Sequence, residues 1–250
     1  MAAPTLEETA TLEGVDSAAL DVTHGMTIAE NDFLIALIAV AGSETPATPS
    51  GWSNRGSSGT TTMALHFRSK IAGDSEPSSY DFSTTTGETC SLIFCRLEGS
   101  TEDDASDVGD TGAGATGVAA ATEITLDNNY PGLETAYENL VMIAACSRAT
   151  ATACGFSSSA ISAGHTSQVE INSVGKIADM NLWTDNSVVT SAPAAKTITE
   201  DEDTFEVDTF AYAWKKIYLR GDLIPVGTPG RDRSMQDNRS LSHPFGSLLR

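Results

Sequence analysis

The fold of this chain is decided by residues 31–40, Asn31-Asp32-Phe33-Leu34-Ile35-Ala36-Leu37-Ile38-Ala39-Val40. The apolar run in this stretch is short and lies between the polar pair Asn31-Asp32 and the turn residues Gly42-Ser43. A short apolar run bounded by turn residues favours a buried central β-strand over a helix. It is also far shorter than the roughly 20 residues that a membrane-spanning helix needs.

Residues 138–146 repeat this pattern in the second half of the chain. In both halves a buried apolar strand is followed by a Gly-aromatic-Ser turn, an alternating strand, a polar stretch and a last strand that carries aromatic residues. Clean helical periodicity is nearly absent. The first series comprises residues 31–40, 51–53, 63–67 and 91–97, and the second comprises residues 138–146, 155–157, 180–183 and 209–215.

This internal repeat predicts an all-β fold. We expect a single jelly-roll-like antiparallel β-sandwich over residues 1–219, with two similar halves, about 15–99 and 123–219, that supply strands to one common core. Residues 100–122 between the halves are rich in Gly, Ala, Asp and Thr without periodicity, which predicts an acidic surface loop.

Residues 220–250 differ in character and are expected to form an extended C-terminal arm. Prolines and glycines interrupt the segment, and it is too polar to bury enough of itself to fold alone. The arm holds five arginines and three aspartates, a net charge of +2, which leaves −22 for the rest of the chain. We expect it to dock on the acidic surface of a neighbouring copy, with a solvated tail as the alternative. The residues expected to make this contact are Arg220, Arg231, Arg233, Arg239, Phe245, Leu248, Leu249 and Arg250.

The formal charge of −20 argues against nucleic acid as a partner, because its phosphate backbone repels an acidic protein. The same charge keeps copies soluble and apart until a specific contact joins them. The N-terminal residues show neither the basic region nor the hydrophobic core of a signal peptide. We therefore expect synthesis in a cytoplasm and no association with a membrane.

Chemistry-bearing residues are scattered rather than clustered. Cys90, Cys95, Cys146 and Cys154 lack paired metal-ligand spacing and are expected to be buried and reduced, with a disulfide as the alternative. The four histidines are isolated, and His66, opposite the apolar face of its strand, is expected at the surface. The acidic stretches 102–110 and 200–203 offer oxygen ligands for Ca²⁺ but lack EF-hand spacing, so solvated loops are favoured. No other cofactor, and no catalytic residue, is expected.

The three tryptophans have two interpretations. Exposed rings at Trp183 and Trp214 would stack on sugars and line a glycan-binding groove. The repeated position of Trp52, Trp183 and Trp214 in the pattern favours core or turn anchors instead, because large aromatic side chains dominate burial.

The chain resembles a family of β-sandwich proteins encoded by tailed bacteriophages. The resemblance spans roughly residues 15–219 and rests on core and turn positions. The matching segments are the apolar strand 31–40, the turn Pro49-Ser50-Gly51-Trp52, the strand 63–67, the turn Ala72-Gly73-Asp74, the strand 80–82 and the strand end Arg96-Leu97-Glu98-Gly99. It implies a virion component of the capsid-decoration, head-fibre or tail-fibre type and carries over no catalytic residue. Residues 220–250 depart from the family's pattern.

The expected function is therefore that of a non-enzymatic virion protein. A capsid decoration or cement protein that docks on copies of itself and on other virion proteins through its C-terminal arm is the first expectation. Such a protein would form homo-oligomers and would be assembled into particles in the host cytoplasm. The alternative is a tail-fibre or receptor-binding module that recognises host surface glycan. A glycan-degrading enzyme is a third possibility, which requires two carboxylates in one cleft.

Overall fold

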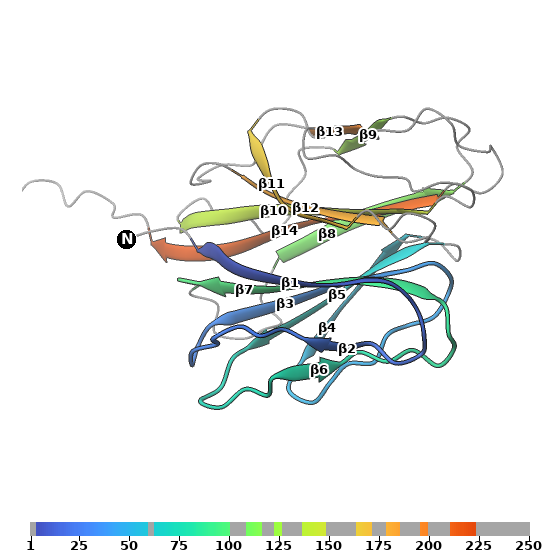
Figure 1. Cartoon of the computed structure of the whole chain (residues 1–250). Coiled ribbons are helices and arrows are strands. Elements are labelled where there is room, and N and C mark those ends of the chain that lie inside the picture. Colours follow the sequence, from blue (N-terminus) through green and yellow to red (C-terminus); the bar gives the residue numbers. More distant parts are fainter. Residues whose placement is uncertain are drawn as a thin grey trace, which may run out of the picture.

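The computed structural model describes residues 4–59, 63–100, 109–116, 123–126, 137–148, 164–171, 179–185, 196–199 and 211–223. All regular structure in these residues is β-strand (Figure 1). None of the described residues belongs to a helix long and apolar enough to cross a membrane. The strands are β1 Thr5–Asp16, β2 Asp21–Thr23, β3 Phe33–Val40, β4 Ser53–Gly59, β5 Ala64–Ile71, β6 Ser79–Asp81, β7 Thr89–Glu98, β8 Gly109–Thr116, β9 Glu123–Leu126, β10 Tyr137–Arg148, β11 His165–Ile171, β12 Asp179–Asp185, β13 Lys196–Thr199 and β14 Ala211–Leu223.

The strands form two five-stranded antiparallel sheets and two small ribbons. The first sheet has the order β1-β7-β3-β5-β4, and the second has the order β11-β12-β10-β14-β8. The ribbons are β2-β6 and β9-β13. The two halves have the same strand pairing: the first sheet and its ribbon are built from β1 to β7, and the second sheet and its ribbon are built in the same way from β8 to β14. The central strand β3, for example, corresponds to the central strand β10. Figure 1 shows β2-β6 on the outer side of the first sheet and β9-β13 on the outer side of the second.

The inner faces of the two sheets meet in one apolar core, which we call the shared core. β3 contributes every second residue to it, from Phe33 to Ala39, and β10 contributes Leu140 to Cys146 in the same alternation. The other members from the first half are Ala41, Met63, Leu65, Phe67, Ile93, Cys95 and Leu97, and those from the second are Ile171, Met180 and Leu182. Strands from both parts of the chain therefore bury their side chains against each other.

The outer face of the first sheet carries a second core, the outer core. The remaining β3 residues, Leu34, Ala36, Ile38 and Val40, pack there against side chains from β2, β6 and β7. Trp52 meets Tyr80 and Phe82 edge-on, with ring centroids 5.1 and 5.2 Å apart. Because both faces of β3 are covered, every one of its residues is buried, and the strand has a continuous apolar sequence rather than an alternating one. Trp52 is a core anchor, as the sequence indicated.

β3 begins at a turn that its sequence specifies. Asn31 adopts a left-handed conformation with φ 70°, which asparagine tolerates better than most residues. Its N–H donates to the carbonyl of Ala72 at 2.9 Å, and the N–H of Ala72 donates to the carbonyl of Asp32 at 2.8 Å. The strand thus starts next to the end of β5, and the register pairs Phe33 with Ile71.

Several boundaries and one burial prediction were wrong. The segment expected to be a loop contains β8, which pairs with β14 at an edge of the second sheet. The first sheet starts at Thr5, about ten residues before the expected boundary, and β14 runs beyond residue 219 to Leu223. His66 is 5% exposed rather than at the surface, because its side of β5 faces the covered outer side of the sheet.

Candidate functional site

The best candidate for a functional surface is the end of the molecule where β7 stops. Arg96 lies near the end of this mostly apolar strand, and its side chain is 10% exposed. Its Nε donates to Oδ2 of Asp32 at 2.6 Å, and Asp32 also accepts the N–H of Ala29 at 2.7 Å. The other guanidinium nitrogens contact Glu98 and Glu8, the latter at 3.4 Å.

These four side chains place one cation among three carboxylates. The hydrogen bond to Asp32 raises the pKa of Arg96, and the negative charges of Asp32, Glu98 and Glu8 act in the same direction, against the effect of burial. The Glu98 and Glu8 side chains remain 49% and 40% exposed. A carboxylate has about four lone-pair positions, so both can accept further hydrogen bonds from a cationic partner.

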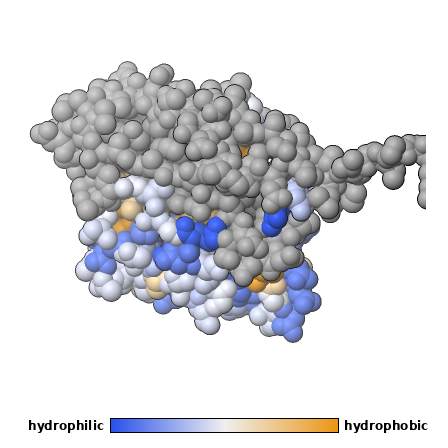
Figure 2. Space-filling model, turned by 180° about the vertical axis from the view of Figure 1, so that it is seen from behind, coloured by the Kyte–Doolittle hydropathy of each residue, from blue (hydrophilic) through white to orange (hydrophobic). Residues whose placement is uncertain are grey.

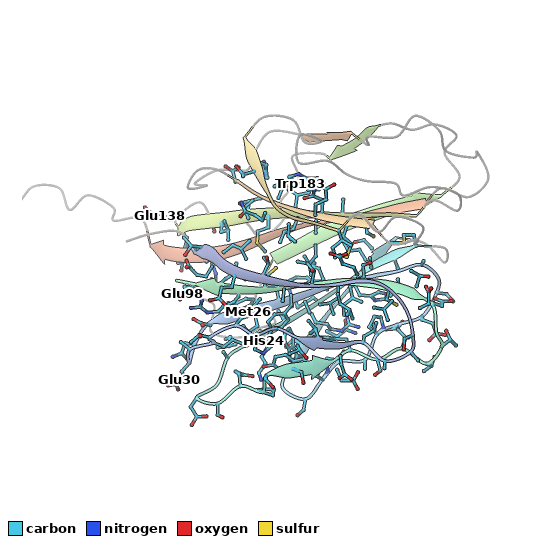
Figure 3. The ribbon with its side chains drawn as sticks, in the orientation of Figure 1. His24, Met26, Glu30, Glu98, Glu138 and Trp183 are labelled. Atoms are coloured by element: carbon cyan, nitrogen blue, oxygen red, sulfur yellow. The ribbon has the colours of Figure 1, made fainter. Side chains whose placement is uncertain are left out.

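The start of β10 lies at the same end of the molecule. Figure 3 shows the labelled side chains of Glu30, Glu98 and Glu138 along this end. The Oε2 atom of Glu138 is shielded from solvent and accepts no hydrogen bond from the described residues. We call Glu8, Asp32, Arg96, Glu98 and Glu138 the acidic end.

The last residues of β14 reach the acidic end. The register pairs Leu223 with Tyr137 and Arg220 with Asn139, on either side of a register shift at Glu138. The guanidinium of Arg220 lies over the ring of Tyr137, 5.4 Å from its centroid. Arg220 therefore belongs to β14 rather than to an arm. The segment from residue 224 onward follows directly from the strand that ends beside Glu138.

Polar groups elsewhere on the first sheet bind other parts of the same chain. Arg68 is completely buried and donates to Asn54 Oδ1 at 2.7 Å, to the Pro46 carbonyl at 2.9 Å and to its neighbour's carbonyl at 3.0 Å. Burial lowers the pKa of Arg68 to about 10. These bonds hold the chain before β4 against the sheet.

A second buried polar group joins β5 to β6. Glu76 accepts the ammonium of Lys70 at 2.6 Å, the hydroxyl of Tyr80 and the N–H of Gly73 at 2.6 Å. Nearby, His24 accepts the N–H of Met26 at 3.1 Å, so its other ring nitrogen carries the proton and donates to the Pro77 carbonyl at 2.8 Å. These bonds fix the β2-β6 ribbon over the outer core.

The side chain of Trp183 is completely buried. This burial counts against the expectation that Trp183 stacks on glycan. Trp214 lies in β14, where its backbone is opposite Ala145 on one side and Ala113 on the other. The remaining predicted contact residues, Arg231, Arg233, Arg239, Phe245, Leu248, Leu249 and Arg250, lie outside the described residues.

The thiols and the possible metal ligands do not form a site within the described residues. Cys90, Cys95 and Cys146 are buried thiols, whereas Cys154 lies outside the described residues. Burial raises the pKa of Cys90 to about 12 and raises that of Cys95 as well. No group of His, Cys, Asp or Glu within the described residues is arranged to hold a metal ion. Most of stretch 102–110 and all of 200–203 lie outside those residues or have no described side chains.

Sequence reasoning missed the acidic end. An arginine inside the apolar strand 91–97 indicates a buried ion pair, because an unpaired charge is costly to bury. Two of its three partners, Asp32 and Glu8, lie 64 and 88 positions away in sequence, so the strand alone does not identify them. No protein-family model, no curated protein and no solved structure matches this chain.

Proposed function

We propose that this chain is a non-enzymatic structural protein of a tailed-phage virion, of the capsid decoration or cement type. In this proposal two similar β units, β1–β7 and β8–β14, form one jelly-roll-like body. The identical strand order of the two sheets and their ribbons supports the duplication. The resemblance of residues 15–219 to phage β-sandwich proteins supports the virion role.

The acidic end is the observation that carries the assembly part of this proposal. Two exposed carboxylates and a shielded carboxylate oxygen, which has no hydrogen-bond partner among the described residues, lie there, at the end of β14. The segment that follows, residues 224–250, contains four arginines and two aspartates, a net charge of +2. Arginine pairs with carboxylates through two parallel hydrogen bonds, which gives both strength and a defined orientation.

Each copy therefore offers an arginine-bearing segment and a matching acidic end. A contact in which the segment of one copy binds the acidic end of the next uses two different surfaces, and its repetition from copy to copy builds rings or continuous arrays. Phe245, Leu248 and Leu249 supply apolar side chains for the same contact. Repeated contacts of this type would join neighbouring copies on a lattice.

The first test measures binding of a labelled peptide of residues 224–250 to the chain shortened to residues 1–223. This truncation keeps all of β14, and circular dichroism checks that the body is folded. We expect saturable binding that weakens when the four arginines of the peptide are replaced by glutamine. The body variant with Glu8→Gln and Glu98→Gln should bind at least tenfold more weakly.

A matched control replaces two exposed carboxylates outside the acidic end, Glu13 and Asp21, by their amides. This variant should bind the peptide as the unmodified body does. Equal binding by all variants, or no binding by the unmodified body, would contradict docking at the acidic end. Quantitative mass spectrometry of purified virions from the phage that encodes the chain tests the location separately. Many copies per particle are expected, and absence from the particles refutes the virion role.

A further inference from the structure

We propose that strands β1–β7 of one copy can pack on strands β8–β14 of a second copy, which gives a dimer with exchanged halves. The partner is a second copy of this chain, and the interaction surface is the shared core. This inference rests on the sheet pairing and the cores, and it does not depend on the virion role.

Backbone hydrogen bonds do not oppose the exchange. The first sheet and the β2-β6 ribbon use only strands β1–β7, and the second sheet and the β9-β13 ribbon use only strands β8–β14. No described strand pairs across this division. The halves are held together by side-chain packing between the two sheets, so they separate without breaking a sheet.

The first half also has a core of its own. The buried residues of the outer core all lie within residues 20–94, between the first sheet and the β2-β6 ribbon. The hydrogen bonds of Arg68, Glu76 and His24 all join parts of this half. The first half therefore keeps its internal contacts when its inner face is not covered by the second half of the same chain.

The inner face of the first sheet cannot remain exposed in water. Phe33, Ile35, Leu37, Phe67, Ile93 and Leu97 are almost completely buried there. Burial of such apolar side chains is the dominant favourable contribution to folding and association. Two arrangements bury this face equally well, namely the closed single chain and the exchanged dimer. Protein concentration and the segment that joins the halves then decide between them.

The chain crosses between the halves once, between the end of β7 at Glu98 and the start of β8 at Gly109. Shortening a connection of this kind prevents closure within one chain and favours exchange with a second. The first variant therefore lacks residues 102–107. The second variant replaces residues 101–107 with a protease recognition sequence of the same length. Both are full chains in every other respect.

We expect the shortened variant to refold as a dimer at micromolar concentration, measured by size-exclusion chromatography with light scattering. The protease-site variant should refold as a monomer at low concentration and yield a growing dimer fraction toward millimolar concentration. Cleavage of that purified dimer should release particles of monomer mass, because each would contain one half from either chain. A dimer joined through surface contacts, including docking of residues 224–250, would keep its mass after cleavage.

A monomeric shortened variant, or a cleaved dimer that keeps dimer mass, would overturn the proposal. If the shortened variant fails to fold, the protease-site variant alone tests whether the halves exchange, since its connection between the halves keeps the natural length. Absence of dimer from that variant at millimolar concentration would also refute exchange. None of these outcomes requires peptide binding at the acidic end.

Discussion

Arg96 shows how one side chain can combine structural and surface roles. It neutralises Asp32, whose side chain is 7% exposed, and its other nitrogens reach two carboxylates that face solvent. The buried contact stabilises the start of β3 against the end of β7. The exposed contacts hold the carboxylates of Glu98 and Glu8 at the surface, where the proposed partner segment would reach them.

Replacing Arg96 with methionine should lower the free energy of unfolding by about 3 kcal/mol, because it leaves the Asp32 carboxylate buried without its counter-charge. Urea denaturation at pH 7 measures this change. The control Glu98→Gln removes a largely exposed partner and should cost less than about 1 kcal/mol. Equal effects of the two substitutions would show that Arg96 does not support a buried pair.

The ionisation of Glu76 should make the free energy of unfolding depend on pH in the acid range. Burial raises the pKa of its carboxyl, but hydrogen bonds from Lys70, Tyr80 and Gly73 and the charge of Lys70 outweigh burial, so the pKa lies below its ordinary value. A carboxyl with a lowered pKa in the folded state stabilises the protein fully above its unfolded pKa, and this contribution is lost as the pH falls through the folded value.

The free energy of unfolding should therefore decrease more steeply from pH 5 to pH 3 in the natural chain than in the variant Glu76→Gln. The variant should be the less stable protein at pH 7. The difference in the free energy of unfolding between the two proteins should decrease as the pH falls. Denaturation curves at pH 3, 4, 5 and 7 measure both quantities. Parallel pH profiles would contradict the assignment of this acid response to Glu76.

Among the strands, those with buried side chains were predicted best from the sequence. β3 and β10 lie at the centre of their sheets, and their apolar runs indicated buried strands correctly. β8 was missed because its residues, GDTGAGAT, carry almost no side-chain pattern, and the strand is defined by its backbone pairing with β14. β1 was also missed, since it is an edge strand with exposed Thr and Glu side chains and two register shifts.

β3 belongs to both cores, so substitutions on either of its faces should destabilise the protein. Leu37→Ala in the shared core and Ile38→Ala in the outer core should each lower the free energy of unfolding by about 3 kcal/mol, through lost burial and the cavity left behind. Thr9→Ala on the exposed side of β1 is the control and should change the free energy of unfolding by less than about 0.5 kcal/mol. A neutral Ile38→Ala would show that the outer face of the first sheet is not a packed core.

The whole molecule combines a large negative charge with a closed apolar interior. On the face shown in Figure 2 the described part of the surface is mostly hydrophilic, and hydrophobic atoms appear only in small patches. The formal charge is −20, of which residues 1–223 carry −22 and residues 224–250 carry +2. Copies therefore repel one another at long range, whereas the proposed docking of segment 224–250 on the acidic end acts at short range.

The salt concentration distinguishes the long-range repulsion between whole copies from the proposed short-range docking of segment 224–250, because the two act over different distances. The Debye length is about 10 Å at 0.1 M salt and about 3 Å at 1 M, so moderate salt screens repulsion between whole bodies before it screens contacts between an arginine and a carboxylate. Association of the full-length chain should therefore increase from 0.01 to 0.1 M salt and decrease toward 1 M. Sedimentation velocity across this range measures it, with the chain shortened to residues 1–223 as the control that stays monomeric. A steady increase in association up to 1 M salt would mean that apolar contacts, rather than arginine–carboxylate pairs at the acidic end, join the copies.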